Sequence, residues 1–395
     1  MKSGLRVERS VNRALFTQVT ITPSIALNLP SKIYLRILSN NKKANSSTMD
    51  MTAITDESSP PFIVAELSGN HGGCLSKALQ LVDKASEAGA DAIKLQTYKP
   101  DTITVDAQDS RFLLQDGLWK GKYLYDLYKQ AMTPWEWHRE IAVRAKEKNM
   151  VCFSSPFDET AVEFLERELN PPLYKIASFE LNHFPLLRKV GALRKPVLAS
   201  IGVSDEEEIG QAVQALKDNG CPEVILLYCV SEYPAKVEDF ELSNLPKIQQ
   251  KFGCKVGLSD HSDGCLMAVA ATALGACVIE KHLTLDRDSS SIDGAFSLLP
   301  EEFTNLCSAV RKAHKGIKSK TSNLMESTRI AKRAKYKRSI LVCKDIKKGE
   351  LLDPTNLRIA RPGDGMCPSK WEVVLNKKAS RDMKVGHPLC REDVS

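Results

Sequence analysis

The chain has 395 residues, enough for one large domain of about 250 residues and a smaller one. With 43% hydrophobic and 26% charged residues it has a globular composition, and because no run of eighteen apolar residues occurs, we expect no membrane span. The net charge is only +6, and Lys and Arg gather near the N-terminus and at 311–348 without interleaved aromatic residues, which argues against nucleic acid as a partner. Eleven cysteines without a C-x-x-C pair fit reduced thiols in the cytoplasm better than disulfides.

The first 48 residues differ from the rest. Glu8 is their only acidic residue, whereas Lys and Arg recur and Ser, Thr and Asn are plentiful. This composition is typical of an organellar transit segment, which would place the protein in an organelle instead of the cytoplasm. The alternative is an untranslated or disordered extension, with the true start at Met49 or Met51. In either case residues 1–58 form an extension outside the predicted fold.

From Pro61 onward, short apolar runs alternate with amphipathic stretches of helical length. The runs are FIVAELS, DAIKLQTY, MVCFSSP, LYKIASFE, KPVLASIG, EVILLYCV, KVGLSDH and CVIEKHLT. Between them lie stretches such as SKALQLVDKASEAGA, TPWEWHREIAVRAKEKN and DEEEIGQAVQALKDNG, several of which begin at Ser, Thr or Asp and end at Gly or Asn. Eight βα units in about 260 residues predict an α/β protein with a TIM (β/α)8 barrel over residues 59–320.

Polar residues end or follow every predicted strand. In a TIM barrel the C-terminal strand ends and the loops after them form the active-site face, so these side chains should converge on one mouth. Strand by strand they are Glu66 with Asn70 and His71; Lys94 and Gln96; Ser154 and Ser155; Lys175, Ser178 and Glu180; Ser200; Ser231 and Tyr233; Ser259, Asp260 and His261; Glu280 and His282. A single charged strand end is commonly a salt bridge at the rim, but eight in succession are not easily explained in that way.

His261 and His282 end consecutive strands, which lie side by side in a parallel barrel. Both imidazoles can then reach one ion while other positions stay open for substrate and water. Such a site suits Mn²⁺, with Mg²⁺ or Co²⁺ as alternatives. The competing interpretation is one structural histidine and one acid–base histidine without a metal.

Lys94 and Lys175 indicate an anionic substrate. Two ammonium groups in a desolvated mouth must be balanced by negative charge. Glu180 and Glu280 could also supply that balance from within the protein, so the sequence leaves both sources open.

Six segments carry a family resemblance. In order and spacing, IVAELSGNHGG, AIKLQTYKP, FSSPFD, YKIASFE, GLSDHS and VIEKHLTLDR resemble the motifs of the sialic acid synthase family, whose members condense phosphoenolpyruvate with an amino sugar. The resemblance covers residues 61–395, and ELSGNH, KLQTY and LYDLYKQAMTPWEWH are most similar to the pseudaminic acid synthase branch. One departure is Ser200-Ile201-Gly202, where the family usually has Ser-Thr-Gly, so a hydroxyl near the expected phosphate site is lost.

The composition of the chain changes beyond residue 320. Residues 321–337 are polar and basic without strand alternation and are interpreted as a linker. Residues 338–395 resemble the small antifreeze-like (SAF) domain that ends these synthases, and in the family this domain reaches over the partner's barrel. The resemblance therefore implies a domain-swapped homodimer in which Arg361 contacts the sugar in the partner's site. An independent ice-binding or carbohydrate-binding module is the alternative for this domain.

The resemblance also implies a mechanism. The sugar aldehyde, polarised by a metal on His261 and His282, is attacked by C3 of phosphoenolpyruvate; water adds at C2 and phosphate leaves, giving a 2-keto-3-deoxy nonulosonic acid. By motif position, the groups expected to hold phosphate and carboxylate are Lys94, Lys175, Ser178, Ser200, Ser231 and Ser259, and those expected to bind the sugar are Asn70, Gln96, Tyr233, Asp293 and Arg361. Glu66 is expected to orient the sugar or the water, and Glu180 or Glu280 to transfer protons; the sequence does not say which.

Three other functions compete with a pseudaminic acid synthase that acts on 2,4-diacetamido-2,4,6-trideoxy-altrose. One is an N-acetylneuraminate synthase that uses N-acetylmannosamine. Another is an inactive barrel that serves as a scaffold or binds carbohydrate, although none of the main strand-end groups is missing. The third is a deoxy-sugar-phosphate synthase, against which the additional C-terminal domain and the GLSDHS segment count.

Overall fold

The computed structural model describes residues 54, 56, 58–287, 291–317 and 327–395. Residues 1–53, and with them the predicted transit segment, lie outside the described part. Within the described residues, no helix has the length and apolar character that crossing a membrane requires. The chain forms two compact units that divide after Ile317.

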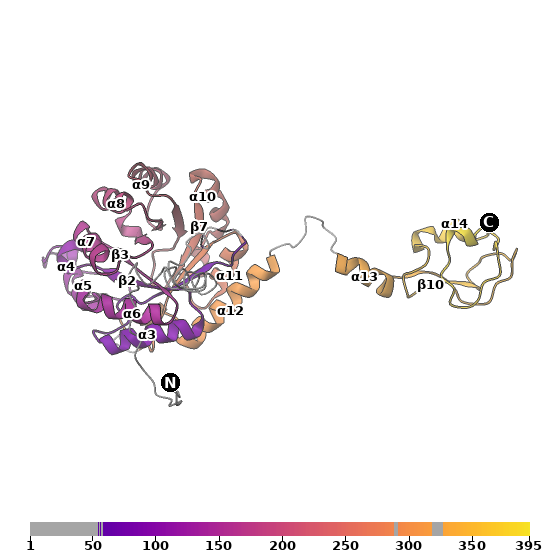
Figure 1. Cartoon of the computed structure of the whole chain (residues 1–395), viewed down its shortest axis with the longest axis horizontal. Helices are drawn as coiled ribbons and strands as arrows, with labels where there is room; N and C mark the ends of the chain where they lie inside the picture. The colour runs from indigo at the N-terminus through magenta and orange to yellow at the C-terminus, as the bar shows by residue number, and fades with distance from the viewer. Residues whose placement is uncertain (1–53, 55, 57, 288–290, 318–326) are drawn as a thin grey trace, which may run out of the picture. The chain divides into compact units, whose positions relative to one another are not determined.

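The first unit is an eight-stranded parallel sheet surrounded by helices (Figure 1). Its strands are β1 (Phe62–Glu66), β2 (Ala92–Thr97), β3 (Val151–Pro156), β4 (Tyr174–Ile176), β5 (Val197–Ser200), β6 (Val224–Tyr228), β7 (Lys255–Asp260) and β8 (Val278–His282). Hydrogen-bonded ladders join them in the order β3-β2-β1-β8-β7-β6-β5-β4, and β3 also contacts β4, so the sheet curls round on itself. The TIM-barrel prediction is confirmed.

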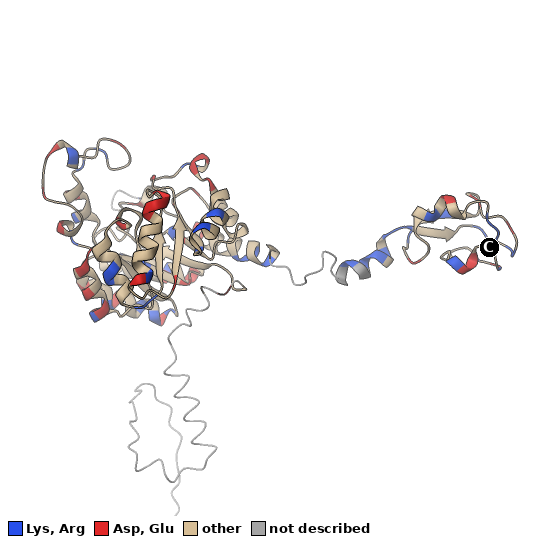
Figure 2. Cartoon of the chain, turned by 90° about the horizontal axis from the view of Figure 1, so that it is seen from above, with Lys and Arg blue, Asp and Glu red and all other residues tan. Residues whose placement is uncertain are grey.

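Helices connect successive strands and cover the outside of the sheet (Figure 1). They are α3 (Leu75–Ala88), α4 (Pro100–Ile103), α5 (Leu124–Ala131), α6 (His138–Glu147), α7 (Glu159–Glu168), α8 (Phe184–Ala192), α9 (Glu206–Asp218), α10 (Leu245–Phe252), α11 (Leu266–Ala273) and α12 (Pro300–Ile317). Local sequence sets their ends. Asp205 caps α9 in a capping box with Glu208, and α3 ends at Gly89, whose φ of 93° disfavours residues with a Cβ. Figure 2 shows acidic and basic residues mixed over these helices.

Alternate residues of each strand point into the barrel. On β1, Phe62 and Val64 belong to an apolar cluster that draws on β1, β2, β3, β5, β6 and β8 and therefore fills the interior. Because strand side chains alternate with a period of two, Glu66 faces the same way. On β8 the same alternation, continued from Val278, turns Glu280 and His282 inward. The barrel interior is thus apolar near the N-terminal ends of the strands and charged at their C-terminal ends.

The second unit is smaller and has its own core. It contains α13 (Ser327–Tyr336), the antiparallel strands β9 (Ser339–Val342) and β10 (Leu357–Ala360), and the short helix α14 (Trp371–Val374). Its core residues are Ile340, Val342, Ile346, Leu352, Leu357, Val374, Ala379, Met383 and Leu389. Helix α13 lies within the segment predicted to be a linker, so part of that segment is helical; its lack of strand alternation excluded a strand but not a helix. The domain boundaries drawn from the sequence remain predictions.

Candidate active site

The ends of β1, β2 and β8 lie at one level of the barrel mouth. Glu66 is the ladder partner of Lys94 on β2 and of His282 on β8. Partners in parallel strands project to the same face, so these three side chains form one layer. All three are buried, with exposures of 0%, 5% and 7%.

A chain of ion pairs runs through this layer. The Nζ atom of Lys94 lies 3.0 Å from Oε2 of Glu66 and 2.9 Å from Oε1 of Glu280. The Nζ atom of Lys175 lies 3.6 Å from the same Glu280 oxygen, and the hydroxyl of Ser259 donates to it at 2.8 Å. The two lysines and two glutamates therefore neutralise one another inside the mouth.

The three glutamates of the mouth differ in proton affinity. Burial raises the pKa of Glu66 to about 7, against the opposing effect of Lys94. Burial also raises the pKa of Glu180 to about 7, with Lys175 opposing it. Burial alone would raise the pKa of Glu280 as well, but Lys175 and Lys94 together hold it below its usual value. Glu280 is thus a fixed carboxylate, whereas Glu66 and Glu180 can exchange a proton near neutral pH.

The two lysines of the mouth, Lys94 and Lys175, also differ in proton affinity. Burial favours the neutral form of Lys94, but Glu280 and Glu66 outweigh this effect and raise its pKa. The pKa of Lys175 is lowered, because burial dominates over the more distant Glu280. An anionic ligand would restore the charge of Lys175 more than that of Lys94.

Several buried polar atoms near the mouth have no hydrogen-bond partner among the described residues. They are the hydroxyls of Ser155 and Ser200, Oε2 of Glu180 and of Glu280, and Nδ1 of His282. Ser155 and Ser200 lie two residues after the interior residues Phe153 and Leu198, so both face inward. A buried polar group left unpaired costs about 1–3 kcal/mol. Their grouping at the mouth therefore indicates a place for a polar ligand.

The loops after β5 and β6 pack closely beside these hydroxyls. A Cβ at Gly202 would lie 2.5 Å from the hydroxyl oxygen of Ser231, so only glycine fits there. The hydroxyl of Ser178 accepts a hydrogen bond from the backbone N–H of Val203 at 3.1 Å. Ile201, which stands where the family usually has threonine, packs in the core outside the barrel, so its side chain faces away from the mouth.

His261 and His282 meet at the mouth with ring centroids 5.4 Å apart. Nδ1 of His261 lies 2.9 Å from the carbonyl oxygen of Val230 and donates to it, which leaves a lone pair on Nε2. Burial lowers the pKa of His261 to about 4 and also lowers that of His282, so both rings are neutral. Two neutral imidazoles, one with an unpartnered Nδ1, fit a divalent ion. Among the described residues no group of three or more His, Cys, Asp or Glu side chains that could hold a metal ion is found, and the protein carboxylate beside the rings is Asp293, whose Oδ2 lies 3.7 Å from Nδ1 of His282.

A hydrogen-bonded network on the other side of Glu66 contains two of the predicted sugar-binding residues, Gln96 and Asp293. The amide of Gln96 donates to Oε1 of Glu66 at 3.1 Å and to the hydroxyl of Ser68 at 3.0 Å. Ser68 in turn donates to Oδ2 of Asp293. Burial raises the pKa of Asp293 to about 6. Ser68 adopts a left-handed φ of 44° and was not singled out from the sequence, because nothing in its pattern distinguishes it from an ordinary turn residue.

Asn70 holds the segment after β8 in place. Its amide donates to the carbonyl oxygen of Leu283 at 3.0 Å and to the hydroxyl of Ser297 at 2.8 Å, and it accepts from the backbone N–H of Asp293 at 3.1 Å. The contacts show Asn70 positioning Asp293; direct binding of substrate by Asn70 stays a prediction.

Aromatic side chains line the mouth above the histidines. Tyr233 lies 4.5 Å from His261 and 5.1 Å from Phe296, and Trp119 lies 5.8 Å from Tyr233, all between ring centroids. Trp119 is not among the residues predicted for the site, because it lies in a segment without periodicity. Tyr98 was also missed; it is a buried residue just past the end of β2, two positions after the inward-facing Gln96, and continuing the alternation by one step could have found it.

Three polar residues expected at the mouth lie elsewhere. The hydroxyl of Ser154 bonds to that of Thr97 on the outer side of the sheet, because Ser154 has the opposite parity to inward-facing Ser155. Asp260 pairs with Lys281, also on the outer side. His71 contacts Thr133 outside the mouth.

Arg361 belongs to the second unit. It is exposed, and its Nε donates to the carbonyl oxygen of Tyr336 at 2.6 Å. This bond leaves both terminal nitrogens of the guanidinium for other partners.

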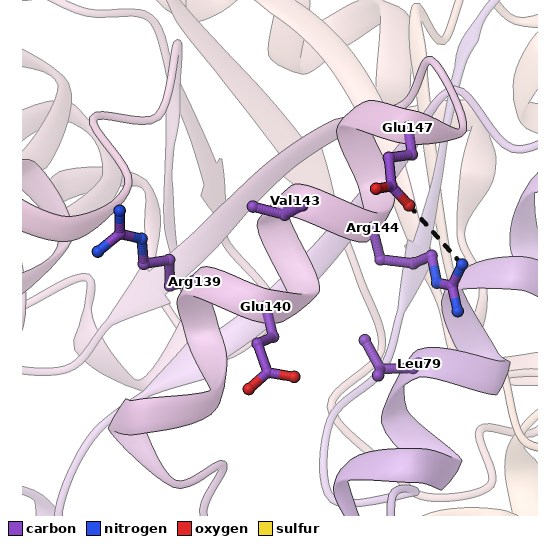
Figure 3. Close-up of a pocket in the computed structure, with 6 residues that line it drawn as sticks. All are labelled: Leu79, Arg139, Glu140, Val143, Arg144 and Glu147. Carbon is purple, nitrogen blue, oxygen red and sulfur yellow. Dashed lines mark ion pairs between the residues drawn. The ribbon is translucent and has the colours of Figure 1, made fainter. Parts of the chain in front are cut away.

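A separate surface pocket of about 450 Å³ lies on the outside of the barrel between α3 and α6 (Figure 3). It is lined by Leu79, Arg139, Glu140, Val143, Arg144 and Glu147. The pocket contains none of the predicted site residues.

Comparison with known proteins identifies the family. Residues 81–322 match the NeuB family, and residues 337–395 match the SAF domain. A pseudaminic acid synthase from Campylobacter jejuni is 43% identical over 332 residues, which cover 84% of this chain and 96% of that protein. The chain belongs to the NeuB family, the sialic acid synthases. The resemblance found in the sequence is thus confirmed.

Further relatives of this chain support the same family. A pseudaminic acid synthase from Helicobacter pylori is 39% identical over 335 residues, which cover 85% of this chain and 98% of that protein. The crystal structure of an N-acetylneuraminic acid synthetase from Leptospira borgpetersenii in complex with citrate has a TM-score of 0.62 and 31% identity, and covers 70% of this chain and 92% of that one. NeuB-family enzymes are generally metal-dependent, in keeping with two neutral imidazoles at the mouth.

Proposed function

We propose that this protein is a pseudaminic acid synthase, a transferase that forms a C–C bond between phosphoenolpyruvate and 2,4-diacetamido-2,4,6-trideoxy-altrose and releases phosphate. The observation that carries the proposal is the buried layer of Lys94, Lys175, Glu66 and Glu280 next to two neutral imidazoles. Relatives of 43% and 39% identity over most of the chain support the choice of sugar.

Phosphoenolpyruvate would bind at the lysine side of the mouth. Lys94 and Lys175 supply the positive charge, and the unpartnered hydroxyls of Ser155 and Ser200 supply donors at the inner surface. Ser178, Ser231 and Ser259 line the same side, on the loops after β4 and β6 and near the end of β7. Together these groups can fix both the carboxylate and the phosphate, so that C3 is presented to the sugar aldehyde.

His261 and His282 would hold a divalent metal, which we propose to be Mn²⁺. When bound, such an ion supplies Lewis-acid polarisation of a carbonyl oxygen. Val230 fixes the orientation of His261 through its carbonyl oxygen, so the free nitrogen of that ring is available to the ion.

Glu66 and Glu180 are the groups suited to proton transfer. Each has a pKa of about 7, close to the pH at which a general acid or base works best. Glu280 serves as the permanent counter-ion of both lysines. Of the two glutamates that the sequence offered for proton transfer, this difference favours Glu180, on the loop after β4, over Glu280. Glu66, although it too can hold a proton, is held by Lys94 and Gln96 and would orient the sugar or the water.

The sugar would occupy the side of the mouth that carries Gln96, Tyr233 and Asp293. Gln96 and Asp293 are tied to each other through Ser68, so they form one rigid surface for hydroxyl and acetamido groups. We further propose a domain-swapped homodimer in which Arg361 of the SAF domain reaches the partner's mouth. Its guanidinium offers a planar fork of donors for sugar oxygens that a lysine would not reproduce. A cytoplasmic location is part of the same proposal.

One assay tests the proposed function. Purified protein is mixed with phosphoenolpyruvate, Mn²⁺ and either the trideoxy sugar or N-acetylmannosamine, and phosphate release is followed. We expect turnover of the trideoxy sugar. Preference for N-acetylmannosamine would reject the branch and keep the family, and no phosphate release with either sugar would favour the inactive scaffold.

A further inference from the structure

Trp119 lies at the tip of a narrow loop between α4 and α5. Leu113 and Tyr123 pair across the base of this loop as an antiparallel bridge, and Leu114 bonds through its backbone to Gly121 and Lys122. The neighbouring tip residue Leu118 is exposed, whereas Trp119 is half-buried. The loop therefore directs the side chain of Trp119, but not that of Leu118, toward the protein.

Two contacts fix the indole over the barrel. Nε1 of Trp119 donates to the carbonyl oxygen of Ile292 at 3.2 Å, and its ring lies 5.8 Å from that of Tyr233. Ile292 belongs to the segment after β8, and Tyr233 belongs to the loop after β6. Trp119 thus joins three loops that reach the mouth from separate strands.

The ring contacts continue without a break to both histidines. Tyr233 packs on His261 at 4.5 Å and on Phe296 at 5.1 Å, and Phe296 packs on His282 at 4.9 Å. We call Trp119, Tyr233 and Phe296 the aromatic wall. It is a continuous row of ring contacts that begins at His282 with the buried Phe296 and ends at the half-buried Trp119.

The charged and apolar parts of the mouth suit different parts of a sugar. Hydroxyl and amide groups can bond to Gln96 and Asp293, but neither residue offers an apolar surface. Aromatic faces favour methyl groups and C–H edges. The trideoxy sugar carries a methyl group at C6, where N-acetylmannosamine carries a hydroxymethyl group, and a second acetamido group at C4.

We infer that the aromatic wall selects for the 6-deoxy end of the sugar, and that Trp119 is a specificity-determining residue. This inference rests on the proposed function and deepens it. An apolar site that holds a methyl group discriminates by about 10²-fold in kcat/KM against an analogue that adds a hydroxyl there. Trp119 acts on the end of the sugar remote from the aldehyde, so phosphoenolpyruvate binding does not depend on it.

The test compares two sugars that differ only at C6: 2,4-diacetamido-2,4,6-trideoxy-altrose and the same sugar with a hydroxyl at C6. In Trp119→Ala we expect kcat/KM to fall by about 10- to 100-fold for the first sugar and by less than about 3-fold for the second. Trp119→Phe retains an aromatic face and should lose less. Where turnover of the second sugar is too slow, its inhibition constant against the first supplies the comparison.

Leu118→Ala is the matched control, because it alters the same loop tip at an exposed side chain. The KM for phosphoenolpyruvate should stay unchanged in all three variants, and the melting temperature should stay unchanged in Leu118→Ala. An unchanged ratio between the two sugars in Trp119→Ala would overturn the inference and leave the proposed function intact. If the wild-type protein turns over neither sugar, the proposed function itself is rejected, and the inference with it.

Discussion

Asp260 and Lys281 are ladder partners on β7 and β8, and each immediately precedes one of the two histidines of the mouth. Their side chains are fully buried, with 2.9 Å between Nζ of Lys281 and Oδ2 of Asp260. Lys281 also donates to the carbonyl oxygen of Ser262, and Asp260 accepts from the backbone N–H of Ser262 at 2.9 Å. The pair therefore fixes the backbone on both sides of His261 and the relative position of the strands that carry the two rings.

Removing only the lysine of this pair should lower the stability of the barrel. Lys281→Met leaves the carboxylate of Asp260 buried without a counter-ion, and we expect a loss of about 3–5 kcal/mol in the free energy of unfolding of the barrel. Adding Asp260→Asn removes the remaining charge and keeps an acceptor for Ser262, so the double variant should recover most of the loss. Urea denaturation followed by circular dichroism measures both changes.

The exposed pair Lys84–Glu87 on α3 serves as the control for this experiment. Lys84→Met should leave the unfolding curve unchanged, because exposed pairs contribute little. A double variant as unstable as Lys281→Met would contradict the account of an unpaired buried charge.

Replacing either histidine of the mouth should weaken metal binding. His261→Ala or His282→Ala removes one of the two protein ligands, and we expect Mn²⁺ affinity, measured by paramagnetic resonance of the free ion, to fall at least about 10²-fold, with a comparable loss of activity. His183→Ala, at a partly exposed histidine before α8, is the control. Wild-type activity that survives EDTA would rule out the metal site.

Glu180 should make stability depend on pH in a defined direction. Its pKa is about 7 in the folded protein and 4.5 without the fold, so folding favours the protonated form. Between about pH 4.5 and 7 the wild-type protein therefore becomes less stable as pH rises, because Glu180 ionises in the unfolded chain at a lower pH than in the folded protein. Glu180→Gln cannot ionise. The melting temperature of the variant minus that of the wild type should therefore increase between pH 4.5 and 7 and stay constant above; a flat difference would show that Glu180 is not held protonated.

Arg361 should act in the partner's site if the dimer is domain-swapped. Arg361→Ala should raise the KM for the sugar or abolish turnover while phosphoenolpyruvate still binds. Mixing Arg361→Ala subunits with His261→Ala subunits should restore part of the activity, because the intact barrel of the first chain is covered by the intact arginine of the second. Arg358→Ala, at an exposed arginine on β10, is the control. No recovery in proven hybrid dimers would mean that Arg361 acts within its own chain or not at all.

Strand parity explains which parts of the site the sequence could reveal. Lys94 and Gln96 are two apart on β2, and Glu280 and His282 are two apart on β8, so an interior apolar residue earlier in each strand fixes their direction. The same rule would have turned Asp260 outward. Counting every polar strand end without regard to parity therefore placed two outer residues, Ser154 and Asp260, at the mouth; His71, in the loop after β1, has no strand parity.

Loop residues follow no such rule. Trp119 and Ser68 reach the mouth through a loop tip and a left-handed turn residue, and their partners Ile292 and Asp293 lie far away in the sequence. No local pattern encodes contacts of this kind, because they depend on how separate loops meet above a finished barrel.

The pairing of Lys94 with Glu66 and Glu280 also bears on which solutes can enter the mouth. A small monovalent anion such as chloride or acetate would have to separate a lysine from a carboxylate already in contact with it, and a single charge does not offset that loss in a desolvated site. A phosphate ester that also carries a carboxylate can engage Lys94 and Lys175 together. The internal counter-ions therefore disfavour small monovalent anions relative to a ligand with several negative charges.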